Sequence, residues 1–131
     1  MTRIIVALLA VLLTAGCVTK PIHNVENRPF PVSTKPLSLD RVEALIIVAG
    51  QPRGWQFKRE RPGHLVASLD QQKRQATVDI RFDERNYTIT HRSSRGLSEK
   101  DGLIHTRYNH WIVLLQRDID ARLSIENIAL R

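Results

Sequence analysis

Hydrophobic and polar residues alternate along the middle of the chain. The clearest run is Gln75 to Phe82, where every second side chain is apolar. This period of two is typical of a strand that buries one face and exposes the other, as in an antiparallel meander. Shorter runs of the same kind lie at 55–57, 65–69 and 87–92, and turn-forming residues separate them at 62–63, 70–73 and 83–86. The pattern predicts three to four antiparallel strands.

A segment before these strands repeats its hydrophobic residues at helical spacing instead. Residues 38–49 are predicted to form a helix, with Ser38 as its N-cap and Asp40 in the first turn, where the helix dipole favours a negative charge. Gly50 is suited to a left-handed C-terminal cap. One face of this helix carries Val42, Leu45, Ile46 and Ala49.

A second helix is predicted after the strands. It begins near His105 or Thr106 and runs to about Leu123, following a loop at 93–102. An order of helix, strands and helix predicts an α+β fold, in which both helices pack on one face of the meander. The apolar stripe of the second helix consists of Tyr108, Trp111, Ile112, Leu115, Ile119 and Leu123.

The N-terminus has the three parts of a secretory signal. Arg3 is followed by an unbroken apolar run, Ile4 to Leu13, and by the small residues Thr14-Ala15-Gly16 just before Cys17. This run of ten residues is too short to span a bilayer, for which a helix needs about 20. The pattern predicts a signal peptide over residues 1–16 and an exported protein.

The stretch Leu12 to Cys17 resembles the lipobox of bacterial lipoproteins, although Thr14 stands where leucine is commonest. The resemblance implies a diacylglycerol group on the Cys17 sulfur, cleavage before Cys17 and acylation of the new amino group. Several acyl chains hold firmly, because each buried methylene contributes about 0.8 kcal/mol. Because Val18 rather than aspartate follows, the resemblance also implies the outer membrane, with the protein facing the periplasm. The alternative is an ordinary secreted protein with an unmodified cysteine.

Residues 17–37 comprise this cysteine and a proline-rich segment. Proline at such density opposes both helix and central strand, so the segment is predicted to be a stiff, extended tether. At about 3.1 Å per residue, it would place a domain of residues 38–131 up to roughly 60 Å from the bilayer. Alternatively, the apolar residues of the segment dock part of it on the domain. The prolines are Pro21, Pro29, Pro31 and Pro36, and the apolar residues are Ile22, Val25, Phe30 and Val32.

The composition favours one small globular domain with a positive charge. The chain has 131 residues, 42% hydrophobic and 25% charged. Arg3 is the only charged residue of the predicted signal peptide, so its removal lowers the formal net charge from +7 to +6. Such a charge favours anionic partners such as acidic proteins, envelope polymers and anionic lipids. Export and an aromatic content of only 5% argue against nucleic acid.

Two basic regions are candidate partner surfaces. In the first, cationic and aromatic side chains are interleaved, as in surfaces that meet phosphate or lipid head groups; the alternative is an early strand with solvated charges. The second is the polar face of the meander, where opposite charges on neighbouring strands give modest support and the alternative is again a solvated face. The first region comprises Arg53, Trp55, Phe57, Lys58, Arg59 and Arg61, and the second comprises Asp79, Arg81, Thr88, Thr90 and Arg92.

Catalytic and metal-binding patterns are weak. His105 and His110 are five residues apart and point to different helix faces, whereas helical zinc pairs are spaced i and i+4. His91 shares the phase of the apolar residues in its strand and is predicted to be packed. Ser93 lies beside His91 in this register, but Asp79 faces the other way, so a catalytic triad is not expected. The single cysteine leaves no disulfide or thiol site. We predict no enzymatic activity, metal or cofactor.

The segment Ile104 to Trp111, together with Arg53-Gly54-Trp55 and Tyr87-x-Ile89, is similar to a group of short proteobacterial lipoproteins. That group carries an Ile-His-x-x-Tyr-Asn-x-Trp element before a C-terminal helix, and the similarity covers most of the predicted domain. A tyrosine is usual in the group at the position of His91, and an asparagine at that of Arg95. The group has no established activity, so the similarity implies fold and location only.

The same segment has two interpretations. In the first it forms the start of the helix, with Trp111 in the core and with Asn109 and the Tyr108 hydroxyl bonded to nearby backbone. In the second it contributes to a shared binding site around Arg53, Trp55, His105 and Asn109.

Together these patterns predict a lipid-anchored protein of the outer membrane, facing the periplasm, with a non-catalytic binding or structural role in the cell envelope. The expected partner is an envelope protein, an envelope polymer or an anionic lipid. The alternatives are a binding module for a small anionic ligand or anionic lipid, and a small envelope hydrolase. The candidate partner surface consists of Arg53, Trp55, Lys58, Arg59, Arg81, Arg92, His105 and Asn109.

Overall fold

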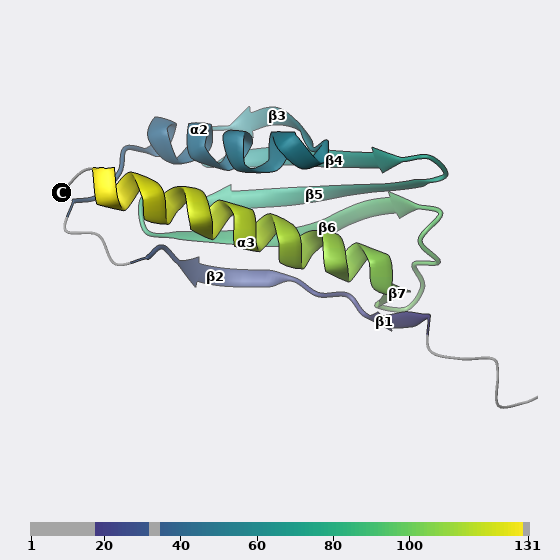
Figure 1. Ribbon diagram of the computed structural model, residues 1–131. Helices are drawn as coiled ribbons and strands as arrows, with labels where there is room; N and C mark the ends of the chain where they lie inside the picture. The colour runs from purple at the N-terminus through teal and green to yellow at the C-terminus, as the bar shows by residue number, and fades with distance from the viewer. Residues whose placement is uncertain (1–17, 32–34, 130–131) are drawn as a thin grey trace, which may run out of the picture.

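The computed structural model describes residues 18–31 and 35–129, so the predicted signal peptide, Cys17 and Val32 lie outside the described residues. Two helices run over one face of a five-stranded antiparallel sheet, and a short two-stranded ladder lies at one end (Figure 1). The helices are α2 (Leu39–Gly50) and α3 (Thr106–Ala129), and the 3-10 turn η2 (Gln51–Arg53) follows α2. The strands are β1 (Thr19–Pro21), β2 (Val25–Pro29), β3 (Gln56–Arg61), β4 (His64–Gln71), β5 (Arg74–Phe82), β6 (Asn86–Arg95) and β7 (Leu103–His105).

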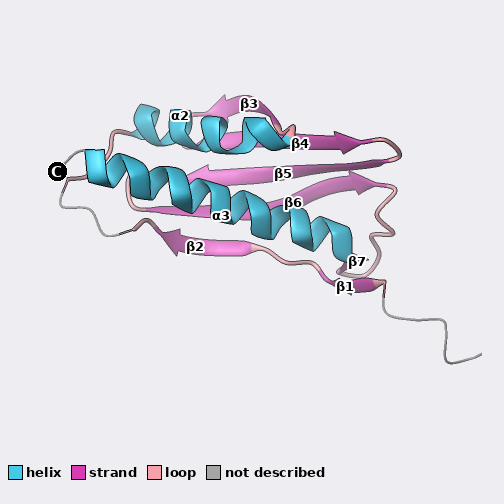
Figure 2. Ribbon diagram, in the orientation of Figure 1, coloured by secondary structure: helices cyan, strands magenta, loops and turns pink. Residues whose placement is uncertain are grey.

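The large sheet has the strand order β2-β6-β5-β4-β3, and all neighbouring strands are antiparallel. Strands β3 to β6 form the meander that the alternating pattern predicts. Both helices lie on the same side of this sheet (Figure 2). The α+β class is therefore confirmed, but the large sheet has five strands rather than three to four.

The additional strand, β2, comes from the segment whose prolines predict a free tether. Val25 pairs with Ile89 of β6, and Pro29 pairs with Asn86. Proline is tolerated because an edge strand leaves one row of backbone groups unpaired. Burial favours docking, since Val25 is only 5% exposed and Phe30 packs against the core. The tether prediction is wrong for this stretch, and the docked alternative is observed.

The chain is already docked where the described residues begin. β1 is antiparallel to β7, with Thr19 opposite His105. The Val18 carbonyl accepts a hydrogen bond of 3.0 Å from the backbone N–H of Thr106, at the start of α3. The folded domain therefore begins within two residues of Cys17, and not at residue 38.

The core lies between the helices and the sheet. It is formed by the apolar phase of each strand and by the apolar stripes of α2 and α3, as their spacing predicts. Each such side chain stabilises the fold by about 1.5–3 kcal/mol when it is fully buried. The fully buried residues include Val42, Ile46, Val78, Ile80, Ile89, Ile112, Leu115 and Ile119.

Helix α2 begins as its capping pattern predicts but ends differently. The Ser38 hydroxyl oxygen accepts a hydrogen bond of 3.2 Å from the backbone N–H of Arg41. Gly50 has a helical φ of −86°, and the left-handed residue is Gly54, with a φ of 100°, after η2. A Cβ on Gly50 would lie 2.5 Å from the ring of Phe57 on β3. Gly50 thus permits close packing of helix and strand rather than chain reversal.

Candidate functional site

Two of the four cations in the basic cluster near β3 are engaged by carboxylates of the two helices. Arg53 Nε lies 2.6 Å from Asp118 Oδ2 on α3, and Arg59 donates two hydrogen bonds to Glu43 on α2. These carboxylates raise the pKa of each guanidinium. Trp55 is 2% exposed and belongs to the core, so it offers no stacking surface. Two arginines of this cluster therefore fasten neighbouring elements to the helices.

Three other residues of the candidate surface, Lys58, Arg81 and Arg92, lie on the sheet face opposite the helices. The register places Lys58, Asp79 and Thr90 in one row across the sheet, and Arg81 two residues along β5. Arg92 Nη1 lies 3.5 Å from Asp79 Oδ1. The shared polar face that the alternation predicts is thus confirmed. We call it the uncovered face, because neither described helix lies over it.

A histidine that the sequence patterns did not single out lies on the uncovered face. His64 Nε2 is 2.7 Å from Asp79 Oδ1, and His64 is only 8% exposed. Its position was detectable in principle: His64 lies opposite Arg81, two residues from Asp79, so the two side chains are diagonal neighbours on one face. Asp79 is therefore shared between an imidazole and the guanidinium of Arg92.

The serine, histidine and aspartate of a conceivable hydrolase are divided between the two sheet faces. His91 packs edge-on against the ring of Tyr108 at 5.2 Å, and burial lowers the pKa of His91. The prediction of a packed histidine is confirmed. A bulge shifts the alternation in β6, so that Ser94 Oγ, at 3.1 Å from His91 Nε2, replaces the predicted neighbour Ser93. Asp79 lies on the other face. β6 extends to Arg95, so its last residues occupy part of the loop that was predicted at 93–102.

The start of α3 agrees only in part with its prediction. Trp111 is 6% exposed and lies in the core. Asn109 ties down backbone, since its Oδ1 accepts a 2.9 Å bond from the N–H of His23 and its Nδ2 donates a 3.0 Å bond to the carbonyl of Pro21. The Tyr108 hydroxyl, in contrast, is buried without a hydrogen-bond partner among the described residues. Burial raises the pKa of Tyr108, and its ring packs against the imidazole of His91.

The predicted shared site around four residues does not form as one site. A hollow of about 350 Å³ brings Arg53 and Trp55 together, but with His110 rather than His105. His105 instead lies on β7, opposite Thr19 of β1. Arg53 meets α3 nine residues beyond Asn109, which is about 13 Å along a helix. Asn109 and His105 serve the docking of the N-terminal segment.

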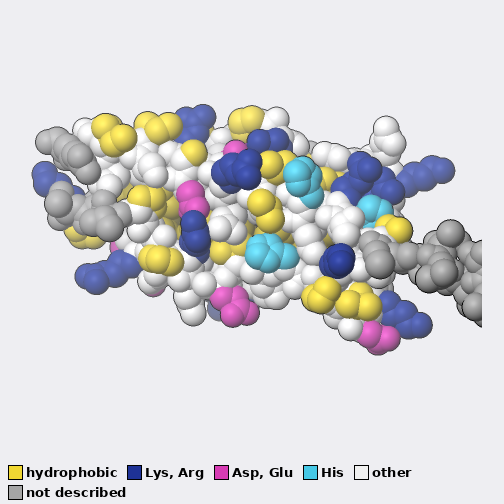
Figure 3. Space-filling view, turned by 60° about the horizontal axis from the view of Figure 1, so that its bottom comes forward, with side chains coloured by type: hydrophobic (Ala, Val, Ile, Leu, Met, Phe, Trp, Pro, Cys, Tyr) yellow, Lys and Arg dark blue, Asp and Glu magenta, His cyan; other side chains and the backbone are white. Residues whose placement is uncertain are grey.

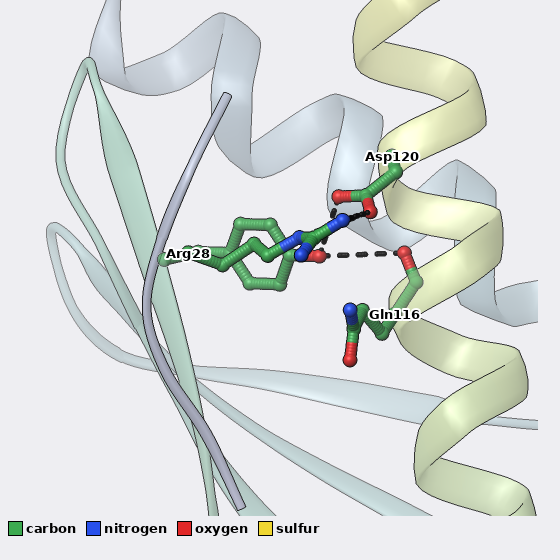
Figure 4. A network of polar contacts seen from close by, with 4 residues as sticks. Arg28, Gln116 and Asp120 are labelled. Carbon is green, nitrogen blue, oxygen red and sulfur yellow. Dashed lines mark hydrogen bonds and ion pairs between the residues drawn. The ribbon is translucent and has the colours of Figure 1, made fainter. Parts of the chain in front are cut away.

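A polar network joins β2, β6 and α3 (Figure 4). The Tyr87 hydroxyl donates a 2.7 Å hydrogen bond to Asp120 Oδ1 and also lies 3.3 Å from the carbonyl oxygen of Gln116. Arg28 Nη2 lies 2.9 Å from Asp120 Oδ2. Burial raises the pKa of Tyr87 above its usual range. The sequence patterns did not indicate this network, because they assign Tyr87 only to the apolar phase of its strand.

Charge is distributed unevenly over the surface. Figure 3 shows Lys and Arg side chains spread over one face and gathered at one end, with fewer Asp and Glu and with scattered hydrophobic residues.

Among the described residues, no three His, Cys, Asp or Glu side chains are grouped so that they could hold a metal ion. In the same part of the chain, no helix has the length and hydrophobicity needed to span a membrane.

The candidate partner surface is thus three separate regions. Arg53 and Arg59 are paired with carboxylates of the helices, beside the buried Trp55. Lys58, Arg81 and Arg92 lie on the uncovered face, and His105 and Asn109 hold the N-terminal segment. No family model matches the chain, and no curated protein or solved structure is significantly similar to it.

Proposed function

We propose that this chain is a lipid-anchored protein of the outer membrane that faces the periplasm and has a binding or structural role rather than a catalytic one. The observation that carries the proposal is the position of Cys17, which follows an apolar run and small residues. β1 begins at Thr19, so cleavage before Cys17 would retain every described helix and strand. A lipid on this residue would join the membrane directly to the folded domain.

The arrangement of polar side chains supports a binding role. The uncovered face is polar and presents Lys58 and Arg81, with Arg92 beside Asp79. An acidic envelope protein or polymer would meet these cations there. A small anionic ligand at Arg53 is less well supported, because Asp118 already compensates this charge at 2.6 Å.

Replacing Cys17 by serine tests the anchor. We expect the wild-type chain in the membrane fraction, with the mass of an acylated protein that begins at residue 17. Cys17→Ser removes the thioether, so the chain is expected to lose its lipid and remain a precursor. Thr14→Leu, which restores the commonest lipobox residue, is the matched control and should retain full lipidation. An intact Met1 or an unmodified thiol in the wild-type chain, read by mass spectrometry, would contradict the proposal.

Photo-crosslinking in cells tests the binding role. A photoreactive amino acid replaces Thr90 on the uncovered face or, as a control, Val113, which is 40% exposed on α3. Because the partner is proposed to meet the uncovered face, a discrete adduct is expected from position 90 and not from position 113. Lys58→Glu with Arg81→Glu should weaken this adduct. Adducts of equal yield at both positions, or none at position 90, would argue against the role.

A further inference from the structure

Basic side chains gather at the end of the domain where the described chain begins. None of them forms an ion pair with another residue of 18–31 or 35–129, whereas Arg28, Arg41, Arg53 and Arg59 all pair with carboxylates. The acidic residues of this end are Asp70, Glu99 and Asp101. We define the anchor-proximal end by its basic residues, which are Lys20, Lys73, Arg74, Arg95, Lys100 and Arg107.

Tertiary contacts assemble this end from distant parts of the chain. Arg74 and Arg107 line one hollow of about 320 Å³. The turn at Lys73 packs against Gly96, which follows Arg95 at the end of β6. Strands β1 and β7 and the start of α3 lie at the same end as this turn (Figure 1). The positive end of the α3 dipole therefore lies among these cations.

The position of Cys17 places this end close to any membrane that holds its lipid. Cys17 precedes the first residue of β1 by two positions. An extended chain spans about 3.4 Å per residue, so Thr19 lies within about 7 Å of Cys17. This distance is comparable with the Debye length of about 8 Å at physiological ionic strength. Unpaired Lys and Arg side chains at this range are attracted by anionic head groups.

We propose that the anchor-proximal end lies against the anionic phospholipid head groups of the anchoring membrane. The domain then stands on this end, with the turn between β5 and β6 pointing away from the bilayer and the uncovered face open to a partner. The orientation rests on the proposed lipidation of Cys17, which supplies the point of attachment. The cations at this end then fix the orientation.

The full-length chain, produced in a bacterium that processes lipoproteins and purified with its lipid, allows a direct test in vesicles. A dye is attached to a cysteine introduced by Gln71→Cys at the anchor-proximal end or by Glu84→Cys at the opposite end. Quenching by a head-group-labelled lipid is measured in phosphatidylcholine with or without about one-third phosphatidylglycerol. With the anionic lipid, we expect quenching at position 71 to be about threefold stronger than at position 84. This difference between the positions should be lost in 1 M salt, where the Debye length is about 3 Å.

Charge reversal supplies the matched comparison. Lys73→Glu, Arg74→Glu and Arg107→Glu together are expected to abolish the difference between the two positions. The same reversal at Arg61, Arg85 and Arg117, which are exposed elsewhere, should leave it unchanged. Circular dichroism establishes that both variants are folded.

Equal quenching at the two positions in anionic vesicles would overturn the proposed orientation. An anionic-lipid effect that survives reversal at the anchor-proximal end would overturn it as well. An unlipidated Cys17 would take up a second dye per chain. The dye count therefore distinguishes a failure of the proposed anchor from a failure of the proposed orientation.

Discussion

Replacing Gly96 by alanine is expected to destabilise the domain by about 3 kcal/mol. Gly96 has a φ of 71°, a left-handed conformation that costs alanine about 1 kcal/mol relative to glycine. A Cβ at this position would also overlap the carbonyl oxygen of Lys73 in the turn between β4 and β5. That oxygen belongs to the backbone, so the overlap is relieved only by moving the turn away from β6.

Gly102→Ala is the control that separates the two costs. Gly102 has a φ of 79°, but no described atom lies within 4 Å of a Cβ at this position. We therefore expect Gly102→Ala to cost only about 1 kcal/mol. Urea unfolding followed by tryptophan fluorescence measures both variants, since Trp55 and Trp111 are buried in the core. Equal losses in the two variants would show that the β4–β5 turn does not press on Gly96.

Replacing Asp120 by alanine is expected to cost about 2 kcal/mol. Asp120 accepts the 2.7 Å hydrogen bond of the Tyr87 hydroxyl, and Tyr87 is only 1% exposed. In the variant this hydroxyl retains only the 3.3 Å contact with the Gln116 carbonyl. The accompanying ion pair with Arg28 adds little, because nearly half of that side chain is exposed.

The double variant with Tyr87→Phe tests this explanation. Removing the hydroxyl together with its acceptor leaves no unsatisfied group, so the double variant should be more stable than the sum of the single losses predicts, by about 1 kcal/mol. The measurement is the free energy of unfolding in urea for all four chains. Strict additivity would mean that the Tyr87 hydroxyl and Asp120 do not interact in solution.

Much of the fold was predictable because its signals are local. The alternation of residues 75–82 reports one strand and its buried face, and the Ser38 cap reports the start of α2. The same alternation correctly placed Asp79 and Arg81 on one polar face. A bulge in β6 was not predictable from alternation, and it exchanged Ser93 for Ser94 beside His91.

The sequence offered docking of this segment only as an alternative, and the pairing of β2 with β6 could not be predicted, because the partner strand lies far away in sequence. Val25 is the only buried residue of that strand, and it pairs with Ile89. Such an edge strand carries too little hydrophobic pattern of its own to outweigh the prolines around it. The carboxylate partners of Arg53 and Arg28 are 65 and 92 residues away, so no local spacing marks them either.

The sequence by itself determined the two helices, the antiparallel meander between them and the lipobox-type cysteine, because each depends on neighbouring residues and a simple period. Only the tertiary structure decided that the segment after Cys17 is docked, which arginines are paired, and which basic residues lie at the same end of the domain as β1. The physical reason is that these features are long-range contacts. Their stability comes from burial and charge pairing between elements, and a chain position alone does not record which elements meet.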